Sequence, residues 1–320
     1  MGAIAEAVRW GVVMPAGPGG PEIERIRDTL ESLHFYEPDV DRVVIVDDDW
    51  EAHRDLRSAA GPLAERTTVV PNPRPRNCDW WSDGVLIGIS AGLELLLLEG
   101  SVDWVLRMDT DALVIAPFSA QITDAFDRDP DLALAGSCDR EVGGGTREVR
   151  QFARPFRKML APVSIWRGGE PHVRTSLVGR GRERSQLIRA AQRRGYRFGE
   201  HCQGGAYAVS MPAVRRLRAR GWVDGHLWYG SRLPEDVIMA VQTCALGMHA
   251  RSMSDDGEPF AVQHVGIPRD PQFLHDHGYA LVHSVKSQEG WTEDELRRRF
   301  RSYREADRER ASRRVGAGRA

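Results

Sequence analysis

Two short apolar segments separated by a helical pattern restrict most strongly what this chain can fold into. Residues Val8–Met14 and Arg42–Val46 are mostly apolar, and residues 22–33 between them repeat apolar side chains every three or four positions. A strand, a helix and a second strand in this order predict a βαβ unit, whose two strands lie parallel in one sheet. The chain is therefore expected to be an α/β protein with a mostly parallel sheet.

Later segments extend this pattern. Residues Thr67–Val70 and Asp103–Met108 predict two further strands, and Gly84–Leu98, which is apolar nearly all round, predicts a buried helix. Residues Leu113–Ile115 are expected to continue the sheet after a bend.

The middle of the chain has a different composition. Residues 139–197 are rich in Arg and Gly with few periodic apolar stretches, so they are expected to be irregular and mobile, with one helix near Arg184–Arg194. Beyond them we predict a strand preceded by two glycines, two helices and a charged C-terminal helix, at 204–210, 212–220, 235–246 and 291–314. Thr292 and Glu295 have the spacing of a capping box at the start of the last helix.

Charge and hydropathy exclude several classes of protein. The 320 residues include 44 Lys and Arg against 46 Asp and Glu, and this net charge of −2 disfavours nucleic-acid binding through bulk positive charge. Apolar runs such as Leu95–Leu98 are far shorter than the ~20 residues that cross a bilayer. The N-terminus also lacks the pattern of a secretory signal. A cytoplasmic protein without a transmembrane segment is expected.

The cysteines do not form a recognisable metal or disulfide pattern. They lie far apart in the sequence and contain no Cys-x-x-Cys pair, at Cys78, Cys138, Cys202 and Cys244. A zinc cluster is therefore not expected, and all four are predicted to be free, buried thiols.

The pair Asp109 and Asp111 is the strongest chemical motif. Carboxylates two residues apart on extended backbone point to the same side, and they follow a predicted strand, where α/β sheets bind ligands. Mg²⁺ and similar ions usually bind proteins through one or two carboxylates plus substrate phosphates. The motif predicts a site for a metal and a diphosphate, although in isolation it also fits a solvated turn.

Acidic residues also follow the second predicted strand. Asp47 and Asp48 at this position can accept hydrogen bonds from a ribose or a base edge. The turn after the first strand, Pro15–Gly20, lacks both the G-x-G-x-x-G and the G-x-x-x-x-G-K-[ST] pattern. A dinucleotide-binding fingerprint and a P-loop are thus excluded.

Two later motifs provide a candidate base and a further metal ligand. Glu235 and Asp236 open a predicted helix, whose N-terminal dipole favours an ionised carboxylate, as a general base requires. His283 could complete the coordination of a metal, and Lys286 could neutralise a phosphate. His201 and His264 are the alternative histidine ligands.

Taken in order, these motifs resemble those of metal-dependent GT-A-type glycosyltransferases, over roughly residues 8–290. The resemblance rests on the segments VDDD, WVLRMDTD, GGAYAVS, PEDV and HSVK. It implies a Rossmann-like nucleotide-sugar domain with a mostly parallel sheet, fused to a smaller acceptor-binding subdomain. The nucleotide-sugar half would span residues 1–138, the acceptor-binding and catalytic half 139–290, and a charged helix and tail 291–320.

The resemblance also implies roles for individual residues. Asp109, Asp111 and His283 would bind Mn²⁺ or Mg²⁺, and Asp236, beside Glu235, would be the general base. The donor, a nucleoside diphosphate sugar such as a UDP-sugar, and its metal would contact a larger set: Pro15, Ala16, Asp47, Asp48, Arg76, Asp83, Asp109, Thr110, Asp111, Gly204, Gly205, His283 and Lys286. The acceptor, a carbohydrate or another small molecule, stays open.

The resemblance therefore implies a hexosyltransferase-like enzyme that inverts the anomeric centre, with retention as the alternative. Residues 139–197 would be either a lid that folds over the donor or a plain surface insertion. A non-catalytic nucleotide-sugar-binding protein and a metal-dependent nucleotidyltransferase are the alternatives. A HAD-type phosphatase fits poorly, because Leu113 stands where Thr or Val is expected and Lys158 lies in the segment predicted to be irregular.

Overall fold

A seven-stranded sheet forms the centre of the computed structural model, which describes residues 8–74, 84–161, 163–166, 172–231 and 233–317. In spatial order its strands are β10 (His249–Ser252), β6 (Leu132–Gly136), β9 (Ala206–Ser210), β4 (Trp104–Met108), β1 (Trp10–Ala16), β2 (Arg42–Asp47) and β3 (Thr67–Pro71). Within the described residues six strands share one direction, and β9 runs against both of its neighbours. The predicted α/β class with a mostly parallel sheet is confirmed.

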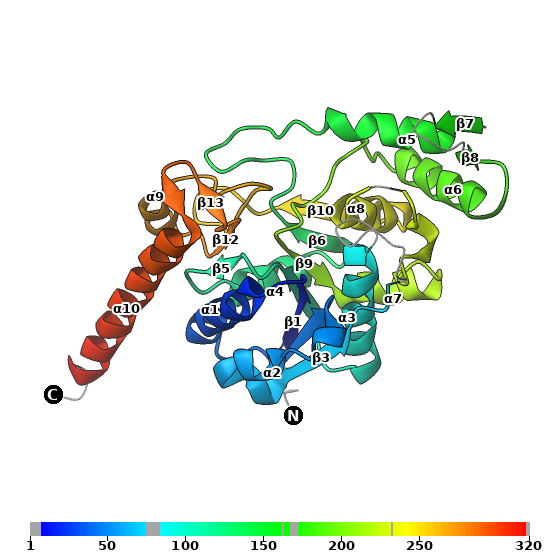
Figure 1. The fold of residues 1–320 in the computed structure, drawn as a ribbon. Coiled ribbons are helices and arrows are strands. Elements are labelled where there is room, and N and C mark those ends of the chain that lie inside the picture. The colour runs from blue at the N-terminus through cyan, green and yellow to red at the C-terminus, as the bar shows by residue number, and fades with distance from the viewer. Residues whose placement is uncertain (1–7, 75–83, 162, 167–171, 232, 318–320) are drawn as a thin grey trace, which may run out of the picture.

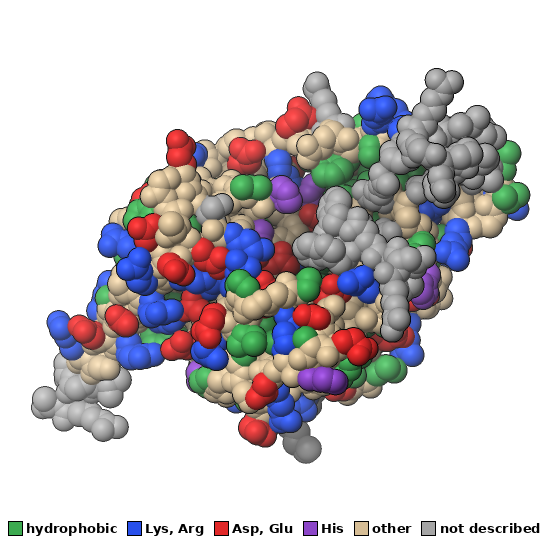
Figure 2. Space-filling model, in the orientation of Figure 1, with side chains coloured by type: hydrophobic (Ala, Val, Ile, Leu, Met, Phe, Trp, Pro, Cys, Tyr) green, Lys and Arg blue, Asp and Glu red, His purple; other side chains and the backbone are tan. Residues whose placement is uncertain are grey.

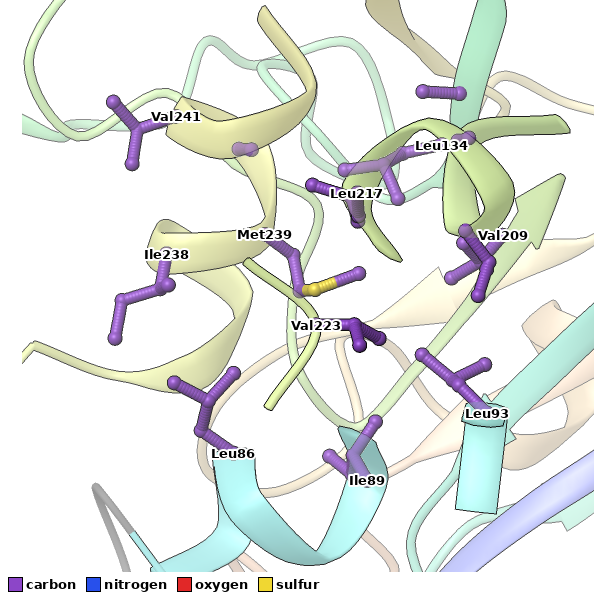
Figure 3. Packing of buried hydrophobic residues seen from close by; sticks show 14 of the residues in the cluster. Leu86, Ile89, Leu93, Leu134, Val209, Leu217, Val223, Ile238, Met239 and Val241 are labelled. Atoms are coloured by element: carbon purple, nitrogen blue, oxygen red, sulfur yellow. The ribbon is translucent and has the colours of Figure 1, made fainter. Parts of the chain in front are cut away.

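Helices cover both faces of this sheet (Figure 1). On one face lie α1 (Pro21–Tyr36), α2 (Leu56–Ala59) and α4 (Ser119–Arg128), and on the other lie α3 (Val85–Glu99), α7 (Met211–Ala219) and α8 (Glu235–Ala245). Neighbouring residues on β1 alternate between these two layers, as Val12 and Val13 do. Because both faces are buried, the inner strands β1, β4, β6 and β9 are mostly apolar rather than alternating. Figure 3 shows the interdigitation of α3, α7 and α8 side chains with those of β6 and β9.

A second, smaller sheet brings the C-terminal part of the chain to the edge of the first. Its order is β11 (Phe260–Val262), β12 (Leu281–His283) and β5 (Leu113–Val114), with β5 antiparallel to β12. The prediction that Leu113–Ile115 continues the main sheet is therefore wrong: β5 leaves it and pairs with β12, which ends at His283. This pairing brings His283 close to the segment that follows β4.

The C-terminal residues form a long helix that packs against the first one. The short elements α9 (Pro271–Asp276), β13 (Ser287–Gln288) and β14 (Trp291–Thr292) precede α10 (Glu293–Ala317), which contacts α1. The capping box is confirmed, since the Thr292 amide donates to Glu295 Oε2 at 2.9 Å and the Glu295 amide donates to Thr292 Oγ1 at 3.3 Å.

The segment 139–197 contains more regular structure than expected. It forms α5 (Ala153–Leu160), the antiparallel pair β7 (Val163–Trp166) and β8 (His172–Thr175), and α6 (Gly179–Arg193), which packs on α8. The predicted helix near Arg184–Arg194 is confirmed as α6, but the expectation that most of the remaining segment is irregular is wrong. The apolar residues that bury α6 are few, namely Leu187, Ile188 and Ala191.

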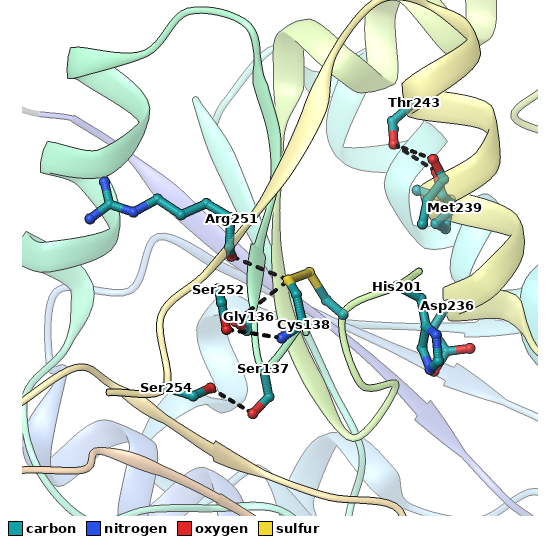
Figure 4. Close-up of a disulfide and its surroundings, with 12 residues drawn as sticks. Gly136, Ser137, Cys138, His201, Asp236, Met239, Thr243, Arg251, Ser252 and Ser254 are labelled. Carbon is teal, nitrogen blue, oxygen red and sulfur yellow. Dashed lines mark hydrogen bonds and ion pairs between the residues drawn. A yellow bond between two sulfur atoms is a disulfide. The ribbon is translucent and has the colours of Figure 1, made fainter. Parts of the chain in front are cut away.

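The cysteine prediction also needs correction. Cys138 follows β6, Cys202 lies in the loop before β9, and a disulfide joins them (Figure 4). They meet because β6 and β9 are antiparallel neighbours, with Gly136 opposite Tyr207, a pairing that a sequence separation of 64 residues conceals. Cys244 is free, as predicted, but only partly buried, and Cys78 lies outside the described residues.

None of the described helices combines the length and apolar character that a membrane crossing requires.

The contact between α3 and β1 gives a stability prediction. A Cβ on Gly92 would lie 2.7 Å from Val13 Cγ1. Gly92→Ala should therefore lower the free energy of unfolding by about 1–2 kcal/mol, because overpacking outweighs the gain that alanine usually brings to a helix. Gly20→Ala is the control: its backbone is helical (φ −63°) and a Cβ there meets nothing within 4 Å, so its effect should stay within about 0.5 kcal/mol. Urea unfolding measures the free energy of unfolding of both variants. A Gly92→Ala protein as stable as wild type would contradict the close contact between Gly92 and Val13.

Candidate active site

A cavity of about 1000 Å³ lies at the carboxyl edge of the central sheet. Residues that follow β1, β2 and β4 line it, as parallel α/β sheets place their ligand crevices. Because β9 is antiparallel, its N-terminal end reaches the same edge and adds Gly204 and Gly205. In Figure 2, histidine and acidic side chains gather in a hollow near the middle of the visible face.

Asp109, Asp111 and His283 form a group that could hold a metal ion. One ligand atom from each lies within 4.8 Å of the others. Nε2 of His283 is 3.5 Å from Asp109 Oδ2 and 3.4 Å from Asp111 Oδ1. Nδ1 of the same ring is 2.7 Å from the Gln263 carbonyl, which places a proton on Nδ1 and turns Nε2 toward the carboxylates, where it could bind a metal after losing its own proton. Two hard oxygen donors and an imidazole fit Mn²⁺ or Mg²⁺.

The glycine pair allows the backbone to approach both acidic groups of the cavity. A Cβ on Gly205 would lie 2.0 Å from Nδ1 of His283, so a larger residue would displace the imidazole. The Asp109 amide also donates to the Gly205 carbonyl at 2.9 Å. A Cβ on Gly204 would lie 3.1 Å from Asp236 Oδ2. Glycine is thus required at Gly205, directly before β9, and a larger residue at Gly204 would crowd Asp236.

When no cation is bound, a proton on His283 lies between this ring and the carboxylates of Asp109 and Asp111. Burial alone would lower the pKa of His283, but Asp111 and then Asp109 raise it to about 9. Burial alone would raise the pKa of Asp111, but His283 and then Lys286, whose Nζ is 3.4 Å from Oδ2, lower it well below its usual range. A bound cation would take the place of this proton between the carboxylates.

Two helices fix the backbone between the carboxylates. Glu22 and Thr29 of α1 both contact Thr110. The Thr110 hydroxyl donates to Glu22 Oε2 at 2.6 Å, and the Thr29 hydroxyl donates to the Thr110 carbonyl at 2.9 Å. Arg297 of α10 donates to the same carbonyl at 3.2 Å and pairs with Asp28 at 2.9 Å. The C-terminal helix therefore supports the turn that carries Asp109 and Asp111.

A second acidic pair, Glu235 and Asp236, lines the cavity at the start of α8. Arg107, buried on β4, lies between the two acidic groups, with Nε 3.1 Å from Glu235 Oε1 and Nη2 2.9 Å from Asp109 Oδ1. Burial raises the pKa of Glu235 to about 8, and Arg107 offsets this only in part. Glu235 is therefore mostly protonated at neutral pH.

Asp236 lies beside His201 (Figure 4). The Val237 amide donates to Asp236 Oδ1 at 2.7 Å, and His201 Nε2 lies 3.4 Å from Asp236 Oδ2. Burial lowers the pKa of His201 although Asp236 opposes the shift, and Nδ1 of this ring is 2.6 Å from the Gly199 carbonyl. His201 is thus a neutral neighbour of Asp236, not a member of the group formed by Asp109, Asp111 and His283.

The structure brings most of the residues predicted from the sequence into this cavity: Pro15, Ala16, Asp48, Asp109, Thr110, Asp111, Gly204, Gly205, Glu235, Asp236, His283 and Lys286. Asp47 is buried and paired with Arg54, and it does not line the described cavity. Asp48 does line it, but Arg74 binds its two oxygens at 2.6 and 3.0 Å. Arg76 and Asp83 lie outside the described residues.

Several residues of the site were not predicted from the sequence. The sequence could have indicated Arg107, because a charged residue inside an otherwise apolar strand needs a buried partner. No sequence pattern indicated Glu22 or Arg147. Arg147 reaches the cavity from residues 139–197 and donates to the His201 carbonyl, a contact that no local pattern encodes.

Comparisons with known proteins give distant structural similarity. No family model and no curated protein matches the chain. A mannosyltransferase from Pyrobaculum calidifontis, solved with GDP-Man and Mn²⁺, is 16% identical with a TM-score of 0.41, and the match covers 78% of this chain but only 56% of that one. The galactosyltransferase LgtC, with donor and acceptor sugar analogues, is 14% identical with a TM-score of 0.42, over 92% and 95% of the chains.

A synthase of 4-diphosphocytidyl-2C-methyl-D-erythritol from Anaerococcus prevotii is also similar, with 10% identity, a TM-score of 0.36 and coverage of 74% and 98%. Similarity this low assigns no function.

The proton on His283 predicts how metal binding depends on pH. Because a cation must displace the proton from His283, Mn²⁺ affinity should rise about tenfold per pH unit up to about pH 9 and then level off. Titration of the protein with Mn²⁺, followed by electron paramagnetic resonance across this range, measures the slope. A flat profile between pH 6 and 8 would show that the proton and the metal do not compete.

The contact from α10 gives a second prediction. Arg297→Met should weaken Mn²⁺ binding by about tenfold, because the Thr110 carbonyl loses a donor that fixes the turn. Arg301→Met is the matched control: Arg301 pairs with the same Asp28, at 3.3 Å, and makes no described contact with the turn. Mn²⁺ titration measures the affinity of both variants. Equal Mn²⁺ affinities of Arg297→Met and Arg301→Met would argue against a positioning role for Arg297.

Proposed function

We propose that this chain is a metal-dependent glycosyltransferase that moves a sugar from a nucleoside diphosphate sugar, a UDP-sugar, to an acceptor hydroxyl. One observation carries the proposal: a group of metal-ligand geometry and a separate acidic pair line the same cavity. Its volume, about 1000 Å³, suits a nucleotide sugar together with an acceptor.

The donor would bind across the carboxyl edge of the sheet. Asp109, Asp111 and His283 would hold Mn²⁺ or Mg²⁺, which supplies positive charge to the diphosphate of the leaving nucleotide. Lys286 is half exposed beside Asp111 and would add a further positive charge. Pro15, Ala16 and Asp48 would contact the nucleoside at the ends of β1 and β2.

The acceptor would approach from the other side of the cavity, where Gln151, Phe152 and Pro155 line it. This arrangement supports nucleoside contacts before residue 139 and acceptor contacts after it, with His283 and Lys286 of the second half contributing to the metal and the diphosphate of the donor.

Asp236 is the better candidate for the general base. Because the pKa of Glu235 is about 8, that carboxyl holds its own proton at neutral pH. Asp236 would accept the proton of the acceptor hydroxyl as the oxygen attacks the anomeric carbon, which inverts that centre in a single displacement. The protonated Asp236 could then donate toward Nε2 of His201 at 3.4 Å.

A donor screen tests the proposal. The protein is incubated with Mn²⁺ and a panel of UDP-, GDP- and dTDP-sugars, and release of the nucleoside diphosphate is followed with and without simple sugar acceptors. Release that Asp109→Ala/Asp111→Ala abolishes supports transfer. Donor binding without release would favour a non-catalytic binding protein, and pyrophosphate formed from a nucleoside triphosphate and a sugar 1-phosphate would favour a nucleotidyltransferase.

The two carboxyls of the acidic pair should respond differently to amide substitution. Asp236→Asn should lower kcat by about 10²–10⁴-fold with little change in Mn²⁺ affinity, because it removes the base. Glu235→Gln should keep kcat within about tenfold, because glutamine resembles the protonated acid. The reverse pattern would assign the base to Glu235, and retention of configuration by nuclear magnetic resonance would contradict the single displacement.

A further inference from the structure

Positive charge is concentrated in one part of the chain. Residues 150–197 contain 13 Lys and Arg against two Asp and Glu, whereas the rest of the chain contains 31 against 44. These residues form α5, β7, β8 and α6, which project from one end of the molecule (Figure 1); we call them the basic lobe. A protein with a net charge of −2 thus has a strongly cationic end.

The exposed face of α6 shows how this charge is arranged. Arg182, Arg189 and Arg193 are exposed. Arg189 and Arg193 follow Arg182 by seven and eleven residues, which places all three on one side of the helix. Its opposite side, with Leu187 and Ile188, is buried. Among the described residues, no acidic side chain lies within ion-pair distance of these three arginines.

Arginines left unpaired in this way do not stabilise the fold through charge pairs. They point to a partner that carries negative charge over an extended surface.

Two exposed aliphatic side chains stand next to this charge. Leu177 and Val178, just before α6, are 60% and 64% exposed, and Arg180 follows two residues later. An anionic bilayer attracts basic side chains to its surface and accepts aliphatic ones below its headgroups. A nucleic-acid backbone offers no comparable environment for a leucine and a valine, so the pair favours lipid over nucleic acid.

We propose that the basic lobe is a docking surface for an anionic lipid bilayer. The lobe binds peripherally, with Arg182, Arg189 and Arg193 against lipid phosphates and Leu177 and Val178 inserted below them. Because α5 contributes Pro155 to the cavity wall, a docked bilayer would lie next to the acceptor side of the cavity. The docking itself does not depend on the proposed transferase activity.

Vesicle binding tests this proposal without any activity assay. The full chain is sedimented with vesicles of phosphatidylglycerol and phosphatidylcholine, and with vesicles of phosphatidylcholine alone. Binding should need the anionic lipid and should weaken as salt is raised. Arg182→Gln/Arg189→Gln/Arg193→Gln should weaken it about 100-fold, since each basic residue near such a surface contributes roughly fivefold.

A matched variant separates the lobe from overall charge. Arg215→Gln/Arg216→Gln/Arg218→Gln removes three exposed arginines from α7, outside the lobe, and should leave vesicle binding within about threefold of wild type. Equal losses in the two triple variants would overturn the assignment to the lobe. All variants are compared at equal helical content by circular dichroism.

The aliphatic pair separates lipid from other polyanions. Leu177→Ser/Val178→Ser should weaken binding to anionic vesicles and leave binding to heparin unchanged. The proposal is overturned if anionic vesicles do not bind, if neutral vesicles bind equally well, or if single-stranded RNA binds and vesicles do not.

Discussion

The crowding of carboxylates at one edge of the sheet is the constraint on which the rest of the site depends. Asp109, Asp111, Glu235 and Asp236 line one cavity, and like charges this close cannot all be ionised without compensation. Arg107 contacts one member of each pair, His283 lies between the first two, and Glu235 keeps its proton. Each of these features prepares the cavity for a further positive charge.

The fold supplies this arrangement through strand direction. In a fully parallel sheet the N-terminal end of β9 would lie at the opposite edge. Because β9 is antiparallel, its glycines pass directly beside Asp109, His283 and Asp236. The switch of β5 to the smaller sheet then brings β12 and His283 to the same place. Segments more than 170 residues apart thereby meet at the turn after β4.

The sequence predicted the parts of the site that local patterns encode. Apolar runs identified the strands, and acidic residues at their ends identified Asp109, Asp111 and Asp48, because parallel strands share a carboxyl edge. Pairings across long separations could not be predicted. The disulfide between Cys138 and Cys202 depends on the register of β6 and β9, and the burial of Asp47 depends on Arg54 from a neighbouring loop.

The central claim is a site for a metal and a nucleoside diphosphate, and the melting temperature with UDP and Mn²⁺ tests it most directly. A ligand at about 100 times its Kd adds about 2.7 kcal/mol, which is several degrees for a chain of this size. The account predicts a shift that needs both UDP and Mn²⁺ and is lost in Asp109→Ala/Asp111→Ala. No shift with UDP, GDP or dTDP in the presence of Mn²⁺, or an equal shift in the double variant, would contradict it.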